Sequence, residues 1–171
     1  IDYLDSNVLS YEFDQVGANG EGVIVNLSGI TGDGTAGQGT ATDGWGGTDT
    51  LTNVNFVRGS SGNDSILGST ANIFEQLEGG AGNDTLDGGA MTIVDGIVTN
   101  GNRVSYQNAL SAVMVDLEAG TATVGVYTDT LSNFNQIRGS NQGDSLYGSG
   151  TTDYAELFEG RGGHGTIGGR G

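Results

Sequence analysis

The sequence contains no cysteine and no proline, and its only cationic side chains are five arginines. Without cysteine there is no disulfide framework, although this absence leaves the compartment open. With a single histidine as well, the chain lacks the nitrogen and sulfur ligands that zinc prefers. No run of about 18 apolar residues occurs, so we expect no segment that spans a membrane.

Acidic side chains and glycine dominate what is present. The 171 residues include 34 glycines and 21 Asp or Glu, which gives a formal net charge of −16. This charge argues against nucleic acid or an anionic membrane as partner. Such a composition is typical of disorder, yet 35% of the residues are hydrophobic and they occur in short β-type patches. We therefore expect a chain whose order depends on cations that neutralise its carboxylates.

One stretch, GGAGNDTLD at residues 79–87, organises the rest. It has the form G-G-x-G-x-D-x-U-x, where U is a large apolar residue, which is the pattern of calcium-binding β-helix repeats. Glycine allows positive φ and leaves the carbonyl oxygens uncovered by side chains. Asp84 adds an anionic oxygen, and Leu86 adds an apolar side chain for a core. Such a loop supplies about half of the 6–8 oxygen ligands that Ca²⁺ takes, so a second loop must stack on it.

The chain duplicates a longer unit around this pattern. Residues 48–69 align with residues 128–149, 80 positions later. No segment shows a helical period, and short apolar patches between Gly, Asn and Asp turns predict strands. We expect an all-β, continuous β-solenoid over residues 1–171, with units 7–89 and 104–171 joined by residues 88–103. Both ends stop inside the pattern, which indicates a piece of a longer repeat protein.

The spacing of apolar residues predicts which strands share a sheet. Alternate strands of a flattened coil lie on one face, which places Leu51, Ile66 and Leu86 together and Phe56 and Leu77 opposite. The turns before the first three then stack on one edge and carry an aspartate each. The opposite edge, at residues 68–73 and 88–93, keeps glycine but lacks aspartate, so we expect little or no metal there.

Calcium is predicted between neighbouring turns, held by aspartates paired across coils. The expected pairs are Asp49 with Asp64, Asp64 with Asp84, and Asp129 with Asp144. The alternative is that each aspartate only caps its own turn. Asn63 and Asn83 are expected to adopt left-handed backbone geometry, and the His164-Gly165 turn is expected to lose its ligand. The full predicted ligand set is Asp49, Asp64, Asp84, Asp129, Asp144, the turn positions Gly44, Gly46, Gly59, Ser61, Gly79, Ala81, Gly139 and Asn141, and Asp2.

These residues give the chain a resemblance to the RTX (repeat-in-toxin, haemolysin-type) calcium-binding repeat family. The likeness is carried by GWGGTDTLT at 44–52, GSSGNDSIL at 59–67 and GGAGNDTLD at 79–87, with GSNQGDSLY at 139–147 as a looser copy. The resemblance implies a right-handed parallel β-roll with calcium between stacked turns. It also implies type I secretion and folding in calcium-rich surroundings outside the cell. Hard oxygen donors on flexible loops agree with Ca²⁺ better than with Mg²⁺, which requires a tighter octahedron.

The sequence thus predicts a calcium-binding structural repeat region of a large secreted or cell-surface protein. Its uses would be as a spacer, an adhesin stalk, a filament or a surface-lattice subunit, with possible self-association. We expect no enzymatic activity, because the single histidine lies in a glycine turn. The alternative is a polysaccharide-binding or substrate-positioning module of an extracellular enzyme, with Trp45 and the tyrosines stacking on sugar rings.

Overall fold

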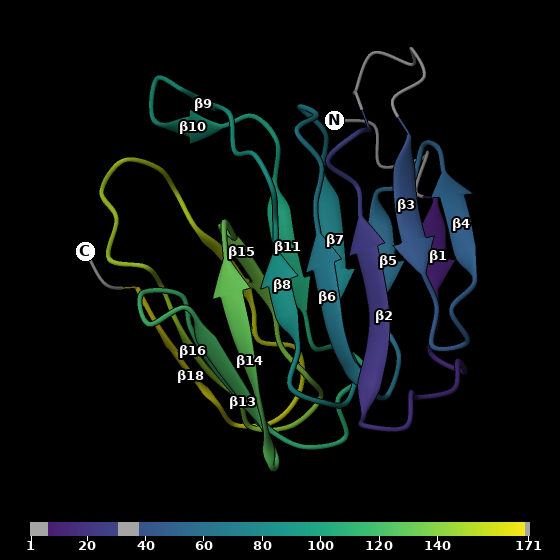
Figure 1. The fold of residues 1–171 in the computed structure, drawn as a ribbon. Helices are drawn as coiled ribbons and strands as arrows, with labels where there is room; N and C mark the ends of the chain where they lie inside the picture. Colours follow the sequence, from purple (N-terminus) through teal and green to yellow (C-terminus); the bar gives the residue numbers. More distant parts are fainter. Residues whose placement is uncertain (1–6, 31–37, 170–171) are drawn as a thin grey trace.

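The computed structural model describes residues 7–30 and 38–169, so the predicted ligand Asp2 lies outside the described residues. Within these ranges the chain forms strands and turns and no helix. Two sheets lie face to face, and the chain passes repeatedly from one to the other (Figure 1). No helix in this part of the chain is long and apolar enough to cross a membrane. The expected all-β class is confirmed.

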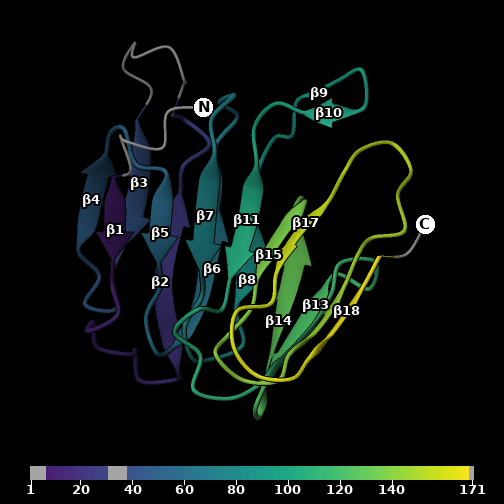
Figure 2. The ribbon, with the colours of Figure 1, turned by 180° about the vertical axis from the view of Figure 1, so that it is seen from behind.

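One sheet, termed here the parallel sheet, contains six strands that all run in the same direction. Each strand lies beside the next one that the chain contributes to this sheet, as Figure 2 shows from behind. In spatial order they are β1 (Val8–Ser10), β5 (Phe56–Arg58), β7 (Glu75–Glu78), β11 (Asn102–Ser105), β15 (Gln136–Arg138) and β17 (Leu157–Glu159).

The other sheet, termed the mixed sheet, contains ten strands. It is parallel where successive coils meet and antiparallel inside two three-stranded meanders, β2-β3-β4 and β12-β13-β14. In spatial order its strands are β4 (Thr48–Leu51), β3 (Gly39–Thr42), β2 (Glu21–Asn26), β6 (Asn63–Leu67), β8 (Thr85–Asp87), β14 (Tyr127–Ser132), β13 (Thr121–Val124), β12 (Val113–Asp116), β16 (Ser145–Tyr147) and β18 (Thr166–Gly168). A separate hairpin, β9 (Ile93–Val94) with β10 (Ile97–Val98), projects from the residues predicted to join the two units (Figure 1).

The core is built from columns of aliphatic side chains between the two sheets. Successive side chains of a strand point to opposite faces of the sheet. In parallel strands in register, residues that pair with each other therefore point to the same face and form a column. On the mixed sheet Ile66, Leu86 and Leu131 pair in register and are buried. The matching column on the parallel sheet contains Val57, Leu77, Val104 and Ile137. Each fully buried aliphatic side chain of this kind stabilises the fold by about 1.5–3 kcal/mol.

The sheet assignment predicted from spacing is confirmed, with one shift of register. Leu51, Ile66 and Leu86 lie in the mixed sheet, and β5 and β7 lie in the parallel sheet. The core side chain of β5 is Val57, which is 3% exposed and pairs with Leu77; it is not Phe56. Phe56 instead packs edge-on against Phe74, with ring centroids 5.7 Å apart.

The coil turn expected over residues 44–49 is wrong, because these residues belong to a hairpin. Gly46 N–H donates to the Asp43 carbonyl (3.0 Å), and the Asp43 carboxylate accepts N–H groups from Trp45 and Gly47. Gly44 and Gly46 therefore form the loop between β3 and β4, where Gly46 has a φ of +81°. The flanking threonines pair across this hairpin, Thr40 with Thr50 and Thr42 with Thr48. Alternating threonines favour such antiparallel pairs.

Candidate metal centre

Four buried aspartates lie in or just before strands β6, β8, β14 and β16 of the mixed sheet. They are Asp64, Asp84, Asp129 and Asp144, each 2–3% exposed. Three of them are linked through the backbone. Asp64 N–H donates to Asp84 Oδ1 (2.9 Å), and Asp84 N–H donates to Asp129 Oδ1 (3.0 Å). The carboxylates of Asp64 and Asp144 accept the N–H groups of Val23 (2.7 Å) and Val113 (3.0 Å) in the same manner. We call this set the aspartate ladder, because each carboxylate binds an amide of a neighbouring strand.

The ladder contains one of the three predicted aspartate pairs. Asp64 and Asp84 are neighbours, but β3 and β2 separate the strand of Asp49 from that of Asp64. In the same way β13 and β12 lie between β14 and β16, so Asp129 and Asp144 are not adjacent. An unpredicted pair, Asp84 with Asp129, connects the two duplicated units instead. The inserted meanders cause this difference, because each adds two strands between the pair of strands that the residue spacing predicted to be adjacent.

Serine closes two of the turns that precede the ladder. Ser60 donates its N–H to Asp64 Oδ2 and its hydroxyl to Asp64 Oδ1, both at 2.7 Å. Ser140 makes the same two bonds to Asp144, at 2.7 and 2.6 Å. The first glycine of each turn, Gly59 or Gly139, lies under the carboxylate, since an added Cβ would come within 2.2 or 2.3 Å of it.

Tyrosine hydroxyls bind the aspartates of the two meanders. Tyr106 donates to Asp129 Oδ2 and Tyr11 donates to Asp49 Oδ2, both at 2.9 Å. Burial and the Asp129 carboxylate raise the pKa of the Tyr106 phenol well above its ordinary value, so this group remains a proton donor. The two contacts are equivalent in the duplicated units, but Asp129 is buried whereas Asp49 is exposed.

Asp84 differs from the other three members of the ladder. Its Oδ2 atom is buried and has no hydrogen-bond partner. Burial is the main cause that raises the pKa of Asp84 to about 8, and the carboxylates of Asp129 and Asp64 raise it further. Gly80 stands where the turns of Asp64 and Asp144 have serine, and its φ is +114°. A buried polar atom without a partner is costly, so this carboxylate requires a proton or a cation.

The two turns stacked at this position carry backbone carbonyl oxygens of the kind that calcium binds. Turns 59–64 and 79–84 stack closely, because a Cβ on Gly80 would lie 2.2 Å from the Ser60 carbonyl oxygen and one on Gly82 would lie 2.2 Å from that of Gly62. The carbonyl oxygen of Gly79 faces Gly59 in the same way. Bare carbonyls with a free carboxylate oxygen form the hard donor set that Ca²⁺ prefers. The residues at Asp84 therefore fit the ion.

Side chains alone would not complete such a site. Among residues 7–30 and 38–169, no group of three or more His, Cys, Asp or Glu side chains is arranged to hold a metal ion. A cation at Asp84 would thus depend on backbone carbonyls, as the predicted roles of Gly79 and Ala81 require. Of the other predicted turn positions, Gly59 and Ser61 lie in the turn closed by Ser60, which stacks on the Asp84 turn. Gly139 and Asn141 lie in the separate turn closed by Ser140.

The asparagines that precede the aspartates form a second set of bonds between coils. Asn63 Oδ1 accepts the N–H of Asn83, and Asn83 Oδ1 accepts the N–H of Thr128, both at 2.8 Å. Neither asparagine has a positive φ, so the expected left-handed geometry is wrong. These side chains instead bind the next coil in parallel with the aspartates, which the repeated Asn-Asp dipeptide could have indicated.

Carboxylates also close turns at the opposite edge, where the sequence showed no aspartate. Glu75 accepts the N–H of Ser69 with both oxygens (3.1 and 3.0 Å), and Glu156 does the same for Ser149 (2.9 and 3.2 Å). In the intervening coil Asn100 Oδ1 accepts the N–H of Thr92. The signal was available in the sequence as Gly-Ser followed by a glutamate after five or six further residues, at 68–75 and 148–156.

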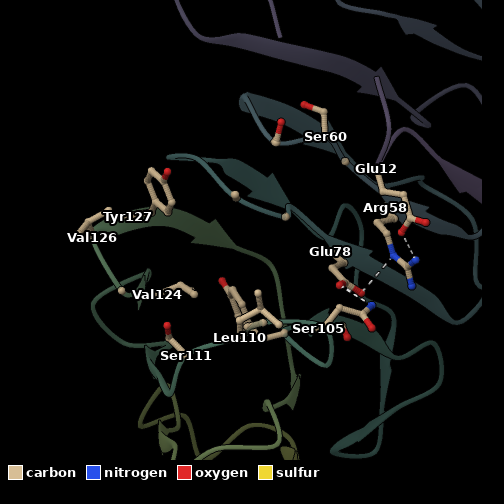
Figure 3. Close-up of a pocket in the computed structure, with 18 residues that line it drawn as sticks. Glu12, Arg58, Ser60, Glu78, Ser105, Leu110, Ser111, Val124, Val126 and Tyr127 are labelled. Atoms are coloured by element: carbon tan, nitrogen blue, oxygen red, sulfur yellow. Dashed lines mark hydrogen bonds and ion pairs between the residues drawn. The ribbon is translucent and has the colours of Figure 1, made fainter. Parts of the chain in front are cut away.

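A groove of about 570 Å³ lies beside the ladder (Figure 3). Its walls are the turns at 59–61 and 80–81, the segment 105–111 and the tip of the β13–β14 hairpin. Arg58 forms ion pairs with Glu12 and Glu78 on one side, and Asn108 donates to Glu78. Leu110, Val126 and Tyr127 lie on the other side and are 94%, 88% and 39% exposed.

Comparison with protein families identifies the repeats. The family described as RTX calcium-binding nonapeptide repeat (4 copies) matches residues 52–72 and 74–90. The resemblance inferred from the sequence is confirmed over these residues. They include the turns at 59–64 and 79–84, whereas residues 44–51 of the hairpin and residues 139–147 lie outside the match. No curated protein matches the chain.

The two tyrosine contacts predict unequal effects of the same substitution. Tyr106→Phe should lower the free energy of unfolding by about 1–3 kcal/mol, because it leaves a buried carboxylate oxygen without its donor. Tyr11→Phe should cost about 1 kcal/mol or less, since water reaches the exposed Asp49. Urea denaturation of both variants at one fixed calcium concentration makes the comparison. Equal losses would contradict the distinction between a buried and an exposed contact.

The buried Glu75 carboxyl, which binds the Ser69 amide, should make the stability of the protein depend on pH. Burial raises the pKa of this carboxyl from its ordinary value of 4.5 to about 7. Between these values the unfolded chain ionises first, so stability is greatest below the lower value and is lost as the pH rises. Glu75→Gln has no proton to lose, and its stability relative to wild type should increase over this interval by up to about 3 kcal/mol. Chemical denaturation across the interval checks this, and parallel curves for the two proteins would refute it.

Proposed function

Because residues 52–72 and 74–90 belong to the RTX calcium-binding nonapeptide repeat family, we propose that this chain is a calcium-dependent structural segment of a large secreted or cell-surface protein. Calcium is the ion that these repeats bind. The observation that carries the proposal is the buried Asp84 Oδ2 without a partner, beside stacked glycine turns with bare carbonyls. That arrangement is destabilising by itself and is relieved by a hard cation.

Asp84 and the carbonyls of its turn would hold the ion, which supplies positive charge between the turns. The protein's own part is to fix the carboxylate. Asp84 Oδ1 is held by the Asp64 amide, and the Asp84 amide is held by Asp129, so the carboxylate cannot rotate freely. Through these two bonds an ion at Asp84 would stabilise the contact of β8 with both β6 and β14.

A stiff stack of coils is the product of this chemistry. In our proposal the stack is a right-handed parallel β-roll, exported by type I secretion and folded by calcium outside the cell. It acts as a spacer, an adhesin stalk, a filament or a surface-lattice subunit, and self-association belongs to the last two uses. The segment carries no catalysis in this proposal: His164 is exposed, and Glu12 and Glu78 are engaged by Arg58 and Asn108.

Removal of calcium tests the proposed function. At a calcium concentration about 100 times Kd, binding should stabilise the native state by about 2.7 kcal/mol. For a chain of this size that corresponds to a rise in Tm of roughly 5–10 °C over the same protein in EGTA. Far-UV circular dichroism during thermal unfolding measures it, with Mg²⁺ at equal concentration as the control. Identical melting curves in calcium and EGTA would defeat the proposal.

The groove favours a second candidate function, a polysaccharide-binding or substrate-positioning module. It combines an exposed aromatic ring, Tyr127, with polar side chains such as Glu78 and Asn108, which is a combination that binds sugar rings. Trp45 is 69% exposed but does not line the groove. The two aromatic side chains can therefore be distinguished experimentally.

A glycan-binding assay in excess calcium decides on the second function. If the groove binds acidic or neutral oligosaccharides, Tyr127→Ala should weaken the affinity about tenfold or more, as expected for loss of a stacking contact in a binding pocket. Trp45→Ala is the matched control and should leave the affinity unchanged. An absence of binding across a broad oligosaccharide array, or equal losses in both variants, would exclude the groove as the glycan site.

A further inference from the structure

We infer that a serine at the second position of a repeat replaces calcium, so that residues 79–84 form the one calcium-dependent turn among those of the described ladder. This inference rests on the proposed function and deepens it by naming which turn holds the ion. It departs from the sequence-based expectation of an ion at every aspartate pair.

Three turns of the chain share glycine at the first position and aspartate at the sixth, and the second position is one of those at which they differ. They are GSSGND at 59–64, GGAGND at 79–84 and GSNQGD at 139–144, so the second residue is Ser60, Gly80 or Ser140. The repeat consensus has glycine at this position. Serine is therefore a departure from the calcium-binding pattern in two of the three turns.

The serine turns use the carboxylate lone pairs that an ion would need. Asp64 Oδ1 accepts bonds from Val23 N–H and the Ser60 hydroxyl, while Oδ2 accepts Ser60 N–H. The Ser60 hydroxyl in turn accepts Gly62 N–H at 3.0 Å, which closes the turn. Asp144 repeats this pattern with Val113, Ser140 and Gln142. A calcium ion would have to displace several buried hydrogen bonds at either position.

The glycine turn has no such closure. Gly80 offers no hydroxyl, and a side chain cannot be added there: its φ is +114°, and a Cβ would approach the Ser60 carbonyl oxygen to 2.2 Å. Close stacking of the two turns thus requires glycine at the position where a hydroxyl would otherwise satisfy the aspartate. The backbone also differs: Ser60 and Ser140 donate their N–H groups to the Oδ2 atoms of Asp64 and Asp144, whereas Gly80 N–H makes no such bond, and Asp84 Oδ2 is buried without a partner.

The two remaining predicted aspartates are closed by tyrosine. Asp129 accepts the Tyr106 hydroxyl, and Asp49 accepts the Tyr11 hydroxyl. Every predicted aspartate ligand within the described residues therefore has a hydroxyl partner, with the exception of Asp84. An ion has access to that turn, because Gly80 and Ala81 line the groove described above.

Calcium stoichiometry of the whole 171-residue chain tests the inference. Isothermal titration and equilibrium dialysis should both give one calcium per chain. Asp84→Asn should abolish binding, and Asp144→Asn should leave one ion bound, although both substitutions remove one carboxylate from the same ladder. Two or more ions in the wild type, with one lost on Asp144→Asn, would overturn the inference while the proposed function stands.

A variant that should gain a calcium site tests the inference independently. Ser140→Gly places the consensus glycine at the second position and removes the hydroxyl from Asp144 Oδ1, so the stoichiometry should rise from one ion to two. Ser140→Thr keeps the hydroxyl and should remain at one. A single ion in Ser140→Gly, with a native circular dichroism spectrum, would refute the replacement of calcium by serine. Absence of any calcium binding by the wild type, together with a Tm unaffected by calcium, would instead refute the proposed function itself.

Discussion

The interaction on which this structure depends is a carboxylate that accepts the backbone N–H of a neighbouring strand. Parallel coils repeat about every 4.8 Å, which would bring equivalent aspartates within strong mutual repulsion. The amide bonds from Asp64 to Asp84 and from Asp84 to Asp129 give one oxygen of each acceptor a donor. They leave the second oxygen to be satisfied by some other group, since a buried oxygen without a donor is costly. Each turn is therefore defined by the group that binds this second oxygen.

Three solutions to this requirement occur in one chain. Serine donates its own N–H to the second oxygen and adds its hydroxyl to the first, tyrosine donates a hydroxyl from the segment that precedes the meander, and the Gly79–Gly80 turn supplies neither. The apolar columns of Leu77 and Leu86 continue through all of these coils, so packing does not depend on which solution a turn uses. Loss of calcium should then loosen the region around β8 before it affects turns that are closed by hydroxyls, because local stability follows local contacts.

Much of this arrangement could be predicted from the sequence. The features that were predicted wrongly or missed have a common physical cause. The nonapeptide at 79–87, the all-β class and the sheet of each aliphatic side chain follow from spacing and glycine chemistry. The hairpin at 43–47 could not be distinguished from a coil turn, because GWGGTD has glycine at the first and fourth positions and aspartate at the sixth, as the repeats at 59–64 and 79–84 do. The contact between Tyr106 and Asp129 joins residues 23 positions apart and appears only once the meander is placed. Spacing along the chain is informative for successive coils and fails where a meander is inserted between them.

Comparison of the two duplicated units distinguishes contacts that depend on the local sequence from contacts that depend on the neighbouring coils. Asn7 binds Asn55 Oδ1 and the Asn53 carbonyl, and Asn102 binds Asn135 Oδ1 and the Asn133 carbonyl, with Asn53 and Asn133 both at positive φ. These contacts are the same in both units although the first set is exposed and the second is mostly buried. Tyr11 and Tyr106 behave likewise. The turns differ, because a Cβ on Gly80 would lie 2.2 Å from the Ser60 carbonyl oxygen, so the residue that stacks on Ser60 must be glycine. Metal dependence in this fold is thus a property of two stacked turns taken together, and a single nonapeptide match is insufficient to assign an ion to it.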